Sequence, residues 1–192
     1  MNRNRFAANA HRLLLAWILG VTNLTAALAA GFVPPLHIQN EVPQARLAGQ
    51  GSFRWLGLKI YDAQLWVSDQ GVIANAPLTG KLALDLRYAR NFQGAKIAAA
   101  CQEEMQKLGL GTAQQRAKWQ TGMEKLFPDV KNGTHLTGVF LPDDGARFYL
   151  DGKLIGEIRD AEFGRAFFAI WLDAGNSAPS LRNALLADAA PR

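Results

Sequence analysis

The β-favouring run Leu58–Val67 predicts a β-strand at the centre of the fold, with successive side chains on opposite faces of a sheet. Apolar side chains occur at both sets of alternate positions, so we expect both faces of the strand to be covered. Three polar side chains, Tyr61, Asp62 and Gln64, fall within this strand. A covered polar group must find a hydrogen-bond partner or line a cavity, because an unpaired one costs roughly 1–3 kcal/mol. This strand is therefore the first place to look for a functional site.

The same reasoning divides the rest of the chain into strands and helices. Alternating segments predict strands over residues 82–88, 134–141, 146–150 and 153–158. Helical periodicity predicts helices over residues 93–108, 112–127, 160–171 and 179–186, with Thr112 and Asp160 as N-terminal caps. Residues 31–43 are expected to form an irregular lead-in with a short edge strand at 37–39. This order predicts an α+β domain in which helices pack on an antiparallel sheet.

The first thirty residues have the pattern of a secretory signal peptide. Three arginines, Arg3, Arg5 and Arg12, precede an apolar run at Leu13–Val21. The segment Ala27–Ala29 supplies the small residues of a cleavage site. A membrane anchor is the alternative, but the run is shorter than the ~20 residues that a spanning helix needs. We therefore predict a signal peptide over residues 1–30, a domain over residues 31–192 and export to a bacterial periplasm.

Composition and charge narrow the class of protein. The chain has 192 residues, of which 49% are hydrophobic and 19% charged, as in a single globular domain. Its formal charge is +5, and cleavage would remove three arginines and no acidic residue, leaving +2. No basic run remains after the signal peptide, so nucleic acid is not an expected partner. Cys101 is the one cysteine, which excludes an intrachain disulfide.

Motifs of the common enzyme classes are absent from the sequence. It contains no Gly-x-Ser-x-Gly elbow, phosphate loop, dinucleotide-binding glycine pattern or His/Cys cluster. We therefore predict no metal and no cofactor. Arg87 and Arg90, at the end of the second predicted strand, belong either to a solvated edge or to an anion-binding site.

Four segments together carry a resemblance to a known family. They are Gly49-Gln-Gly51 with Arg54, the strand Leu58–Trp66, the hairpin Ala146–Lys153 and the closing helix Phe167–Asp173. In their order and spacing the chain resembles the bacterial chalcone isomerase-like proteins over nearly all of the predicted domain. The resemblance implies the chalcone isomerase fold, a large antiparallel sheet with helices packed on one side and a ligand cleft between them.

The resemblance also implies site residues. In plant chalcone isomerases and the related fatty-acid-binding proteins, an arginine after a Gly-x-Gly turn and a hydroxyl residue on the next long strand face the cleft. The hydroxyl position matches Tyr61, and Arg54 follows Gly51 one residue later than in the usual Gly-x-Gly-x-Arg. In a strand, a shift of one residue turns a side chain to the opposite face unless a bulge corrects it. Phe53 would then hold the place expected for the arginine.

The enzyme's remaining signature is only partly retained. A tyrosine, a lysine and an asparagine at the start of the helix after the second strand match Gln93, Lys96 and Ala100, so only the lysine is kept. Cyclisation needs a polar array that activates the ketone, and glutamine and alanine do not rebuild it. The resemblance therefore does not carry chalcone isomerase activity over to this chain.

Three functions remain open. The leading hypothesis is a periplasmic, non-catalytic binder of an apolar, fatty-acid-like ligand held by Tyr61, Arg54 and Lys96. The second is an isomerase or intramolecular lyase that acts on another substrate with Lys96 and Arg54. The third is a structural envelope protein in which large aromatic side chains fill the cleft, namely Trp66, Trp119 and Phe167.

Overall fold

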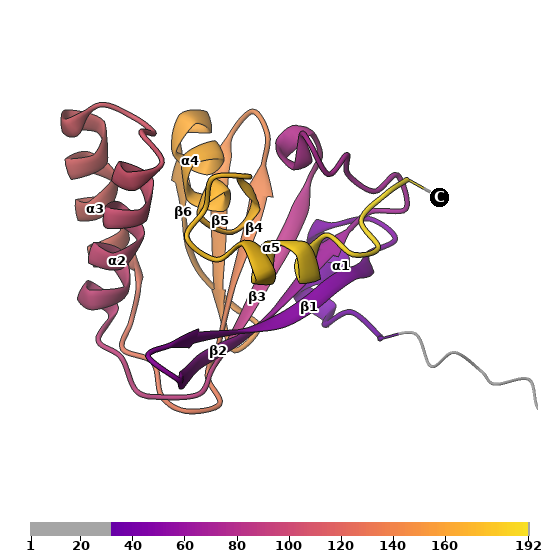
Figure 1. Ribbon diagram of the computed structural model, residues 1–192, viewed down its shortest axis with the longest axis horizontal. Helices are drawn as coiled ribbons and strands as arrows, with labels where there is room; N and C mark the ends of the chain where they lie inside the picture. Colours follow the sequence, from indigo (N-terminus) through magenta and orange to yellow (C-terminus); the bar gives the residue numbers. More distant parts are fainter. Residues whose placement is uncertain (1–31, 192) are drawn as a thin grey trace, which may run out of the picture. The chain divides into compact units, whose positions relative to one another are not determined.

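A computed structural model describes residues 32–191, which form six strands and the helices around them (Figure 1). The strands pair in sequence order, each antiparallel to the next, so the sheet is an open meander. They are β1 (Arg46–Trp55), β2 (Leu58–Val67), β3 (Leu82–Tyr88), β4 (His135–Leu141), β5 (Gly145–Leu150) and β6 (Lys153–Arg159). The antiparallel α+β architecture predicted from the sequence is confirmed. The predicted signal peptide lies outside the described residues.

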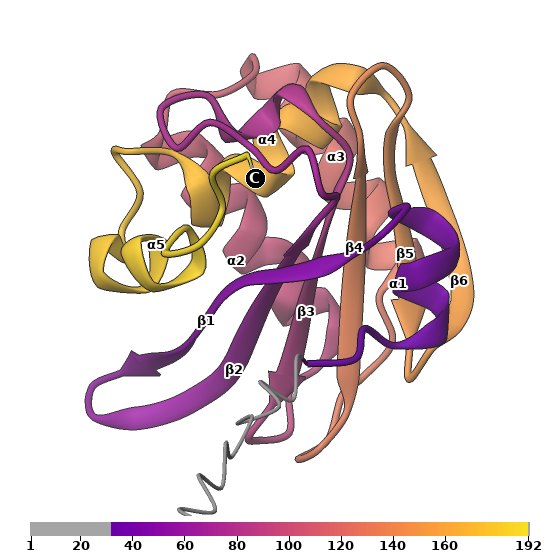
Figure 2. The ribbon, with the colours of Figure 1, turned by 90° about the vertical axis from the view of Figure 1, so that its right-hand side faces the viewer.

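Four helices cover one face of the sheet, which we call the helical face (Figures 1 and 2). They are α2 (Gly94–Lys107), α3 (Ala113–Leu126), α4 (Ala161–Leu172) and α5 (Pro179–Leu185). A short 3-10 helix, η1 (Pro77–Thr79), follows β2. The bounds of α2 to α5 lie within two residues of the sequence prediction. The capping residues act as predicted: Thr112 forms a reciprocal capping box with Gln115, and the Asp160 carboxylate accepts from the first backbone N–H groups of α4.

The prediction of a short edge strand at residues 37–39 is wrong, because these residues belong to helix α1 (Leu36–Glu41). The backbone N–H of Ile38 donates to the carbonyl of Pro35, and that of Val42 donates to Ile38. Ile38 and Val42 are four residues apart and share one side of the turn, where they pack against Trp66. Helix α1 therefore covers part of the other face of the sheet, which we call the second face (Figure 2).

The main core lies between the sheet and the helical face and is rich in aromatic side chains. Phe148 on β5 is fully buried, with its ring centroid 5.1 Å from that of Phe167 on α4 and 5.0 Å from that of Phe127. Helix α5 crosses β1 at Gly49, where a Cβ atom would overlap the carbonyl oxygen of Ala184. Glycine is required there because the two backbones touch.

Candidate functional site

Tyr61 on β2 lies in a group of rings at one end of the helical face. It is directly opposite Phe53 on β1 and Tyr88 on β3. The Phe53 ring stacks on Tyr61 with centroids 5.2 Å apart, and the Tyr88 ring meets it edge-on at 5.9 Å. Helix α4 adds Trp171 and the segment before α2 adds Phe92. We call these five residues the aromatic layer.

The Tyr61 hydroxyl makes one hydrogen bond across this layer. The indole N–H of Trp171 donates to it at 3.0 Å. Burial raises the pKa of the Tyr61 hydroxyl, so the phenol keeps its proton at neutral pH. Within residues 32–191 the hydroxyl donates to no acceptor. The Tyr61 phenol, oriented by the Trp171 bond, therefore offers a proton that a bound molecule could accept. The Tyr88 hydroxyl also makes no hydrogen bond within the described residues, but it belongs to a buried residue.

The pairing of β1 with β2 contains a β-bulge on β2, while regular alternation along β1 decides where Arg54 lies. Phe53 pairs with Tyr61 but Arg54 pairs with Lys59, so Ile60 is an extra residue on β2. Phe53 faces the aromatic layer, while Arg54 is exposed and donates to the carbonyl of Gly57 at 3.2 Å. The structure therefore does not bring Arg54 and Tyr61 together, and Phe53 stands beside Tyr61 instead.

The same bulge changes the face of Lys59. Strict alternation predicts that Lys59 shares a face with Tyr61, but its ammonium group forms an ion pair with Asp62 at 2.6 Å. The prediction was wrong because Ile60 interrupts the alternation. The expectation that both faces of β2 are covered holds only in part: Trp66 is buried under α1, while Asp62 and Gln64 are partly exposed.

Trp66 also lies apart from the other two residues proposed to fill the cleft. Trp119 and Phe167 belong to the core on the helical face, whereas Trp66 packs with α1 on the second face. The expectation that these three side chains fill one cleft is therefore wrong, because they lie on opposite faces of the sheet.

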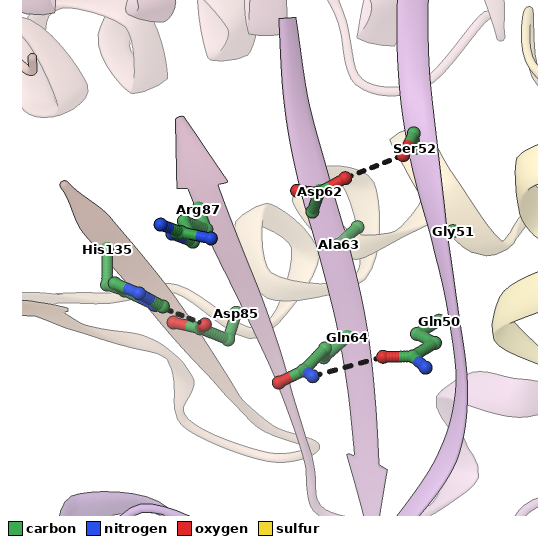
Figure 3. Close-up of a pocket in the computed structure, with 9 residues that line it drawn as sticks. All are labelled: Gln50, Gly51, Ser52, Asp62, Ala63, Gln64, Asp85, Arg87 and His135. Carbon is green, nitrogen blue, oxygen red and sulfur yellow. Dashed lines mark hydrogen bonds and ion pairs between the residues drawn. The ribbon is translucent and has the colours of Figure 1, made fainter. Parts of the chain in front are cut away.

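A polar hollow of ≈ 280 Å³ lies on the second face, beyond the part that α1 covers (Figure 3). Alternation along the strands brings its residues together: Asp62 and Gln64 on β2 stand opposite Arg87 and Asp85 on β3, respectively. His135 on β4 stands opposite Arg87 on its other side. The remaining lining residues come from β1 and β2, namely Gln50, Gly51, Ser52 and Ala63.

Asp85 is the buried centre of this polar group, with 4% of its surface exposed. One carboxylate oxygen accepts from the Thr137 hydroxyl at 2.6 Å and the other pairs with His135 Nδ1 at 2.7 Å. Since Thr137 gives its proton to Asp85, the His37 Nε2 atom that lies 3.0 Å from Thr137 Oγ1 acts as a donor. This network ties α1 to β3 and β4.

The two histidines have opposite pKa shifts. The hydrogen bond to Asp85 raises the pKa of His135, although partial burial lowers it. Burial is the main reason that the pKa of His37 is lowered. At neutral pH the Asp85–His135 pair therefore carries more positive charge on its imidazole than an isolated histidine would.

Most polar side chains in the hollow bond to one another. Ser52 donates to Asp62 at 2.6 Å, and Gln64 donates to Gln50 at 3.2 Å (Figure 3). Arg87 differs, because its exposed guanidinium makes no hydrogen bond or ion pair within the described part of the chain. Of the two interpretations of Arg87, a solvated edge and an anion site, the exposure fits the first and the free donors fit the second.

Two further features are absent from residues 32–191, a clustered metal site and a membrane-spanning helix. No group of three His, Cys, Asp or Glu side chains is arranged there to hold a metal ion. No helix in that range combines the length and the hydropathy that crossing a bilayer requires.

Residues 29–187 match the family described as chalcone isomerase-like. The chain belongs to the chalcone isomerase-like family. A protein of Haemophilus influenzae, described as uncharacterized, is 27% identical to it over 138 residues, which cover 72% of this chain and 66% of the relative. The chain thus matches slightly less than two thirds of that relative's length.

A solved structure of the same fold is the fatty-acid binding protein of Arabidopsis thaliana. Its crystal structure superimposes with a TM-score of 0.61 and 13% sequence identity, covering 77% of this chain and 89% of that one. At that identity the likeness shows the fold alone. The predicted chalcone isomerase fold is therefore confirmed.

Within this chalcone isomerase-like chain, the residues matched to the enzyme's helix signature point to solvent. Gln93, Lys96 and Ala100 are all exposed on or just before α2. The buried side of α2 is formed by Gly94, Ala98, Cys101 and Met105. Lys96 is therefore on the solvent side of α2, and the structure does not bring Tyr61, Arg54 and Lys96 into one cluster. Trp171, which does contact Tyr61, lay in a predicted helix, but its indole donor was not recognised as part of a site.

Proposed function

We propose that this chalcone isomerase-like protein is a periplasmic, non-catalytic binder of an apolar ligand with an acidic head, of the fatty-acid class. The observation that carries the proposal is the Tyr61 hydroxyl, which accepts from Trp171 and has its own proton unused within residues 32–191. A phenol of raised pKa is a neutral donor, and a carboxylate is a strong acceptor for it.

The burial pattern supports an entrance to the aromatic layer. Phe53, Tyr61, Phe92 and Ile97 are only half-buried, whereas Tyr88 behind them is buried. Half-buried rings have fewer contacts to lose than core rings when a ligand displaces them. An alkyl tail that takes their place gains roughly 0.8 kcal/mol for each methylene it buries. Under this proposal the positive charge that attracts the acidic head comes from Lys96, which is exposed on α2.

The test is titration of a fluorescent long-chain fatty acid into the wild type and single variants. Tyr61→Phe should weaken binding about tenfold, which corresponds to ~1.4 kcal/mol. Tyr88→Phe is the matched control, since Tyr88 lies one strand away and its hydroxyl makes no hydrogen bond within the described residues. Arg54→Met should leave the affinity unchanged, because Arg54 is exposed and bonded to Gly57. Equal affinities for the wild type and Tyr61→Phe would contradict the proposal.

One observation favours a second candidate, a structural envelope protein. The protein's own rings occupy the space around Tyr61, with Phe53 stacked on one side and Tyr88 edge-on at the other. Under this alternative no fatty acid binds with saturation to either the wild type or the variants. The same titration therefore separates the two candidates.

A further inference from the structure

The hairpin that joins β1 to β2 ends in an exposed apolar tip. Trp55, Leu56 and Leu58 are 62%, 85% and 50% exposed, and Gly57 completes the turn. In Figure 2 this end of the hairpin projects beyond the neighbouring elements, and its exposed fractions show that the described chain leaves much of its surface uncovered. We call residues 55–58 the hairpin tip.

The backbone conformation of the turn is unfavourable for Leu56. Leu56 and Gly57 both have positive φ, 48° and 80°, as in the two-residue turns that close β-hairpins. Asparagine, aspartate or glycine normally occupies the first of these positions, because a branched side chain is strained there. Leu56 is thus strained and exposed at once, and neither property stabilises the domain. Such a residue is expected where the tip has a partner.

Cationic residues lie next to the hairpin tip and on the segments that adjoin its base. Arg54 and Lys59 flank it directly, as cross-strand neighbours. Arg90 lies at its base, because the backbone N–H of Ala89 donates to the carbonyl of Ile60 at 2.8 Å. Lys131 is in the adjoining loop, which is held to the segment after β3 by paired Phe92 and Val130.

The acidic groups at this end of the sheet are already engaged. Asp62 is paired with Lys59 at 2.6 Å, and Asp129 accepts from the backbone N–H of Gly94 at 2.9 Å. Arg54, Arg90 and Lys131 form no ion pair within residues 32–191. The hairpin tip is therefore an apolar point within a surface of net positive charge.

We propose that the hairpin tip inserts into the interface of an anionic lipid membrane, with Arg54, Arg90 and Lys131 lying on the lipid phosphates. Tryptophan favours the boundary between headgroups and acyl chains, and exposed leucines enter the acyl region. Basic side chains close to an anionic leaflet add electrostatic attraction that salt weakens. The proposal goes beyond ligand binding at Tyr61 and does not depend on it.

The test measures partitioning of the purified full chain onto vesicles by sedimentation. Vesicles of phosphatidylcholine alone are compared with vesicles containing phosphatidylcholine and phosphatidylglycerol. The wild type should bind the anionic vesicles at least tenfold more tightly than the neutral ones, and added salt should weaken the binding. A double variant, Trp55→Ser with Leu56→Asn, should lose at least tenfold of the partition coefficient on anionic vesicles.

The substitutions separate a membrane role from a folding role. Asparagine tolerates the positive φ at position 56, so the double variant should melt at or above the temperature of the wild type while binding vesicles less tightly. Ile73→Asn is the matched control, since Ile73 is 60% exposed in the loop after the opposite end of β2. It should bind vesicles like the wild type. All three proteins carry the same N-terminal residues, so those residues cannot cause a difference between them.

Two outcomes would overturn the proposal. The first is a double variant that binds anionic vesicles as tightly as the wild type. The second is a wild type that does not bind vesicles but forms dimers in sedimentation velocity, while the double variant stays monomeric. The latter result would assign the hairpin tip to a second copy of the chain.

Discussion

Changing Tyr61 to phenylalanine tests the polar pair at the centre of the aromatic layer. The substitution keeps the ring and its contacts with Phe53 and Tyr88, so it creates almost no cavity. In the wild type the Trp171 indole N–H donates to the Tyr61 hydroxyl at 3.0 Å, and the substitution removes this acceptor. A buried donor left without a partner costs about 1–3 kcal/mol. For a domain of this size, ~2 kcal/mol corresponds to a fall in Tm of roughly 4–8 °C.

A double-mutant cycle assigns this cost to the hydrogen bond. Trp171→Phe alone loses the donor and also leaves a void in the core, so it should destabilise the ligand-free protein by about 2–4 kcal/mol. With both changes present the bond is lost only once, and the coupling energy should be ~1 kcal/mol. Urea unfolding followed by circular dichroism measures these free energies without depending on tryptophan fluorescence.

Tyr88→Phe is the control, because it removes a neighbouring hydroxyl that makes no hydrogen bond within residues 32–191. It should change the free energy of unfolding by less than about 0.5 kcal/mol. If Tyr61→Phe costs no more than Tyr88→Phe, or if the coupling energy is close to zero, the polar pair contributes nothing. The assignment of Tyr61 as an oriented donor would then be refuted.

Three further predictions concern other parts of the chain. Gly49→Ala should destabilise the protein by ~2 kcal/mol or more and speed hydrogen exchange in α5, whereas Gly80→Ala, with no atom closer than 4.0 Å to the added Cβ, should be nearly neutral. His135→Gln should reduce stability by about 1 kcal/mol near pH 6 and by progressively less toward pH 9. The raised pKa of His135 sets this sign, because a proton held more tightly in the folded state stabilises it until the pH passes the folded-state pKa. Chalcone should not be cyclised above background, and an enhancement that Lys96→Met abolishes would contradict the expectation drawn from the Gln93 and Ala100 departures.

The sequence predicted the longer elements well because their signals are local. Helix α3 begins after a capping box, and α4 begins after an aspartate cap, both visible as single residues before a periodic segment. Helix α1 was missed because its six residues include a single buried apolar side chain, Ile38, and the residue that pairs with it, Val42, comes just after the helix. Strand β1 was not delimited because Gly49 and Gly51 stand where side chains would have shown the alternation.

The candidate site depended on information that is not local. Arg54 comes one residue later than in Gly-x-Gly-x-Arg, which indicated that Phe53 holds the position expected for the arginine. The structure puts Phe53 beside Tyr61. The bulge at Ile60 could not be predicted, since it is a property of the pairing of two strands. The polar hollow was hidden for the same reason: the register of three strands brings Asp62, Asp85 and His135 to one face.

The position of Phe53 constrains how the proposed ligand is held. With Phe53 in the layer and Arg54 outside it, the donor beside the rings is a neutral phenol rather than a guanidinium. An ionised carboxylate deep in such a layer would lose its hydration without gaining a counter-ion, which is unfavourable. The acidic head is therefore expected on the solvent side of the layer, within reach of the Tyr61 hydroxyl, and its attraction to the exposed Lys96 is screened by water. It follows that fatty-acid affinity should fall only slightly as salt is added, whereas vesicle binding through the hairpin tip should fall steeply.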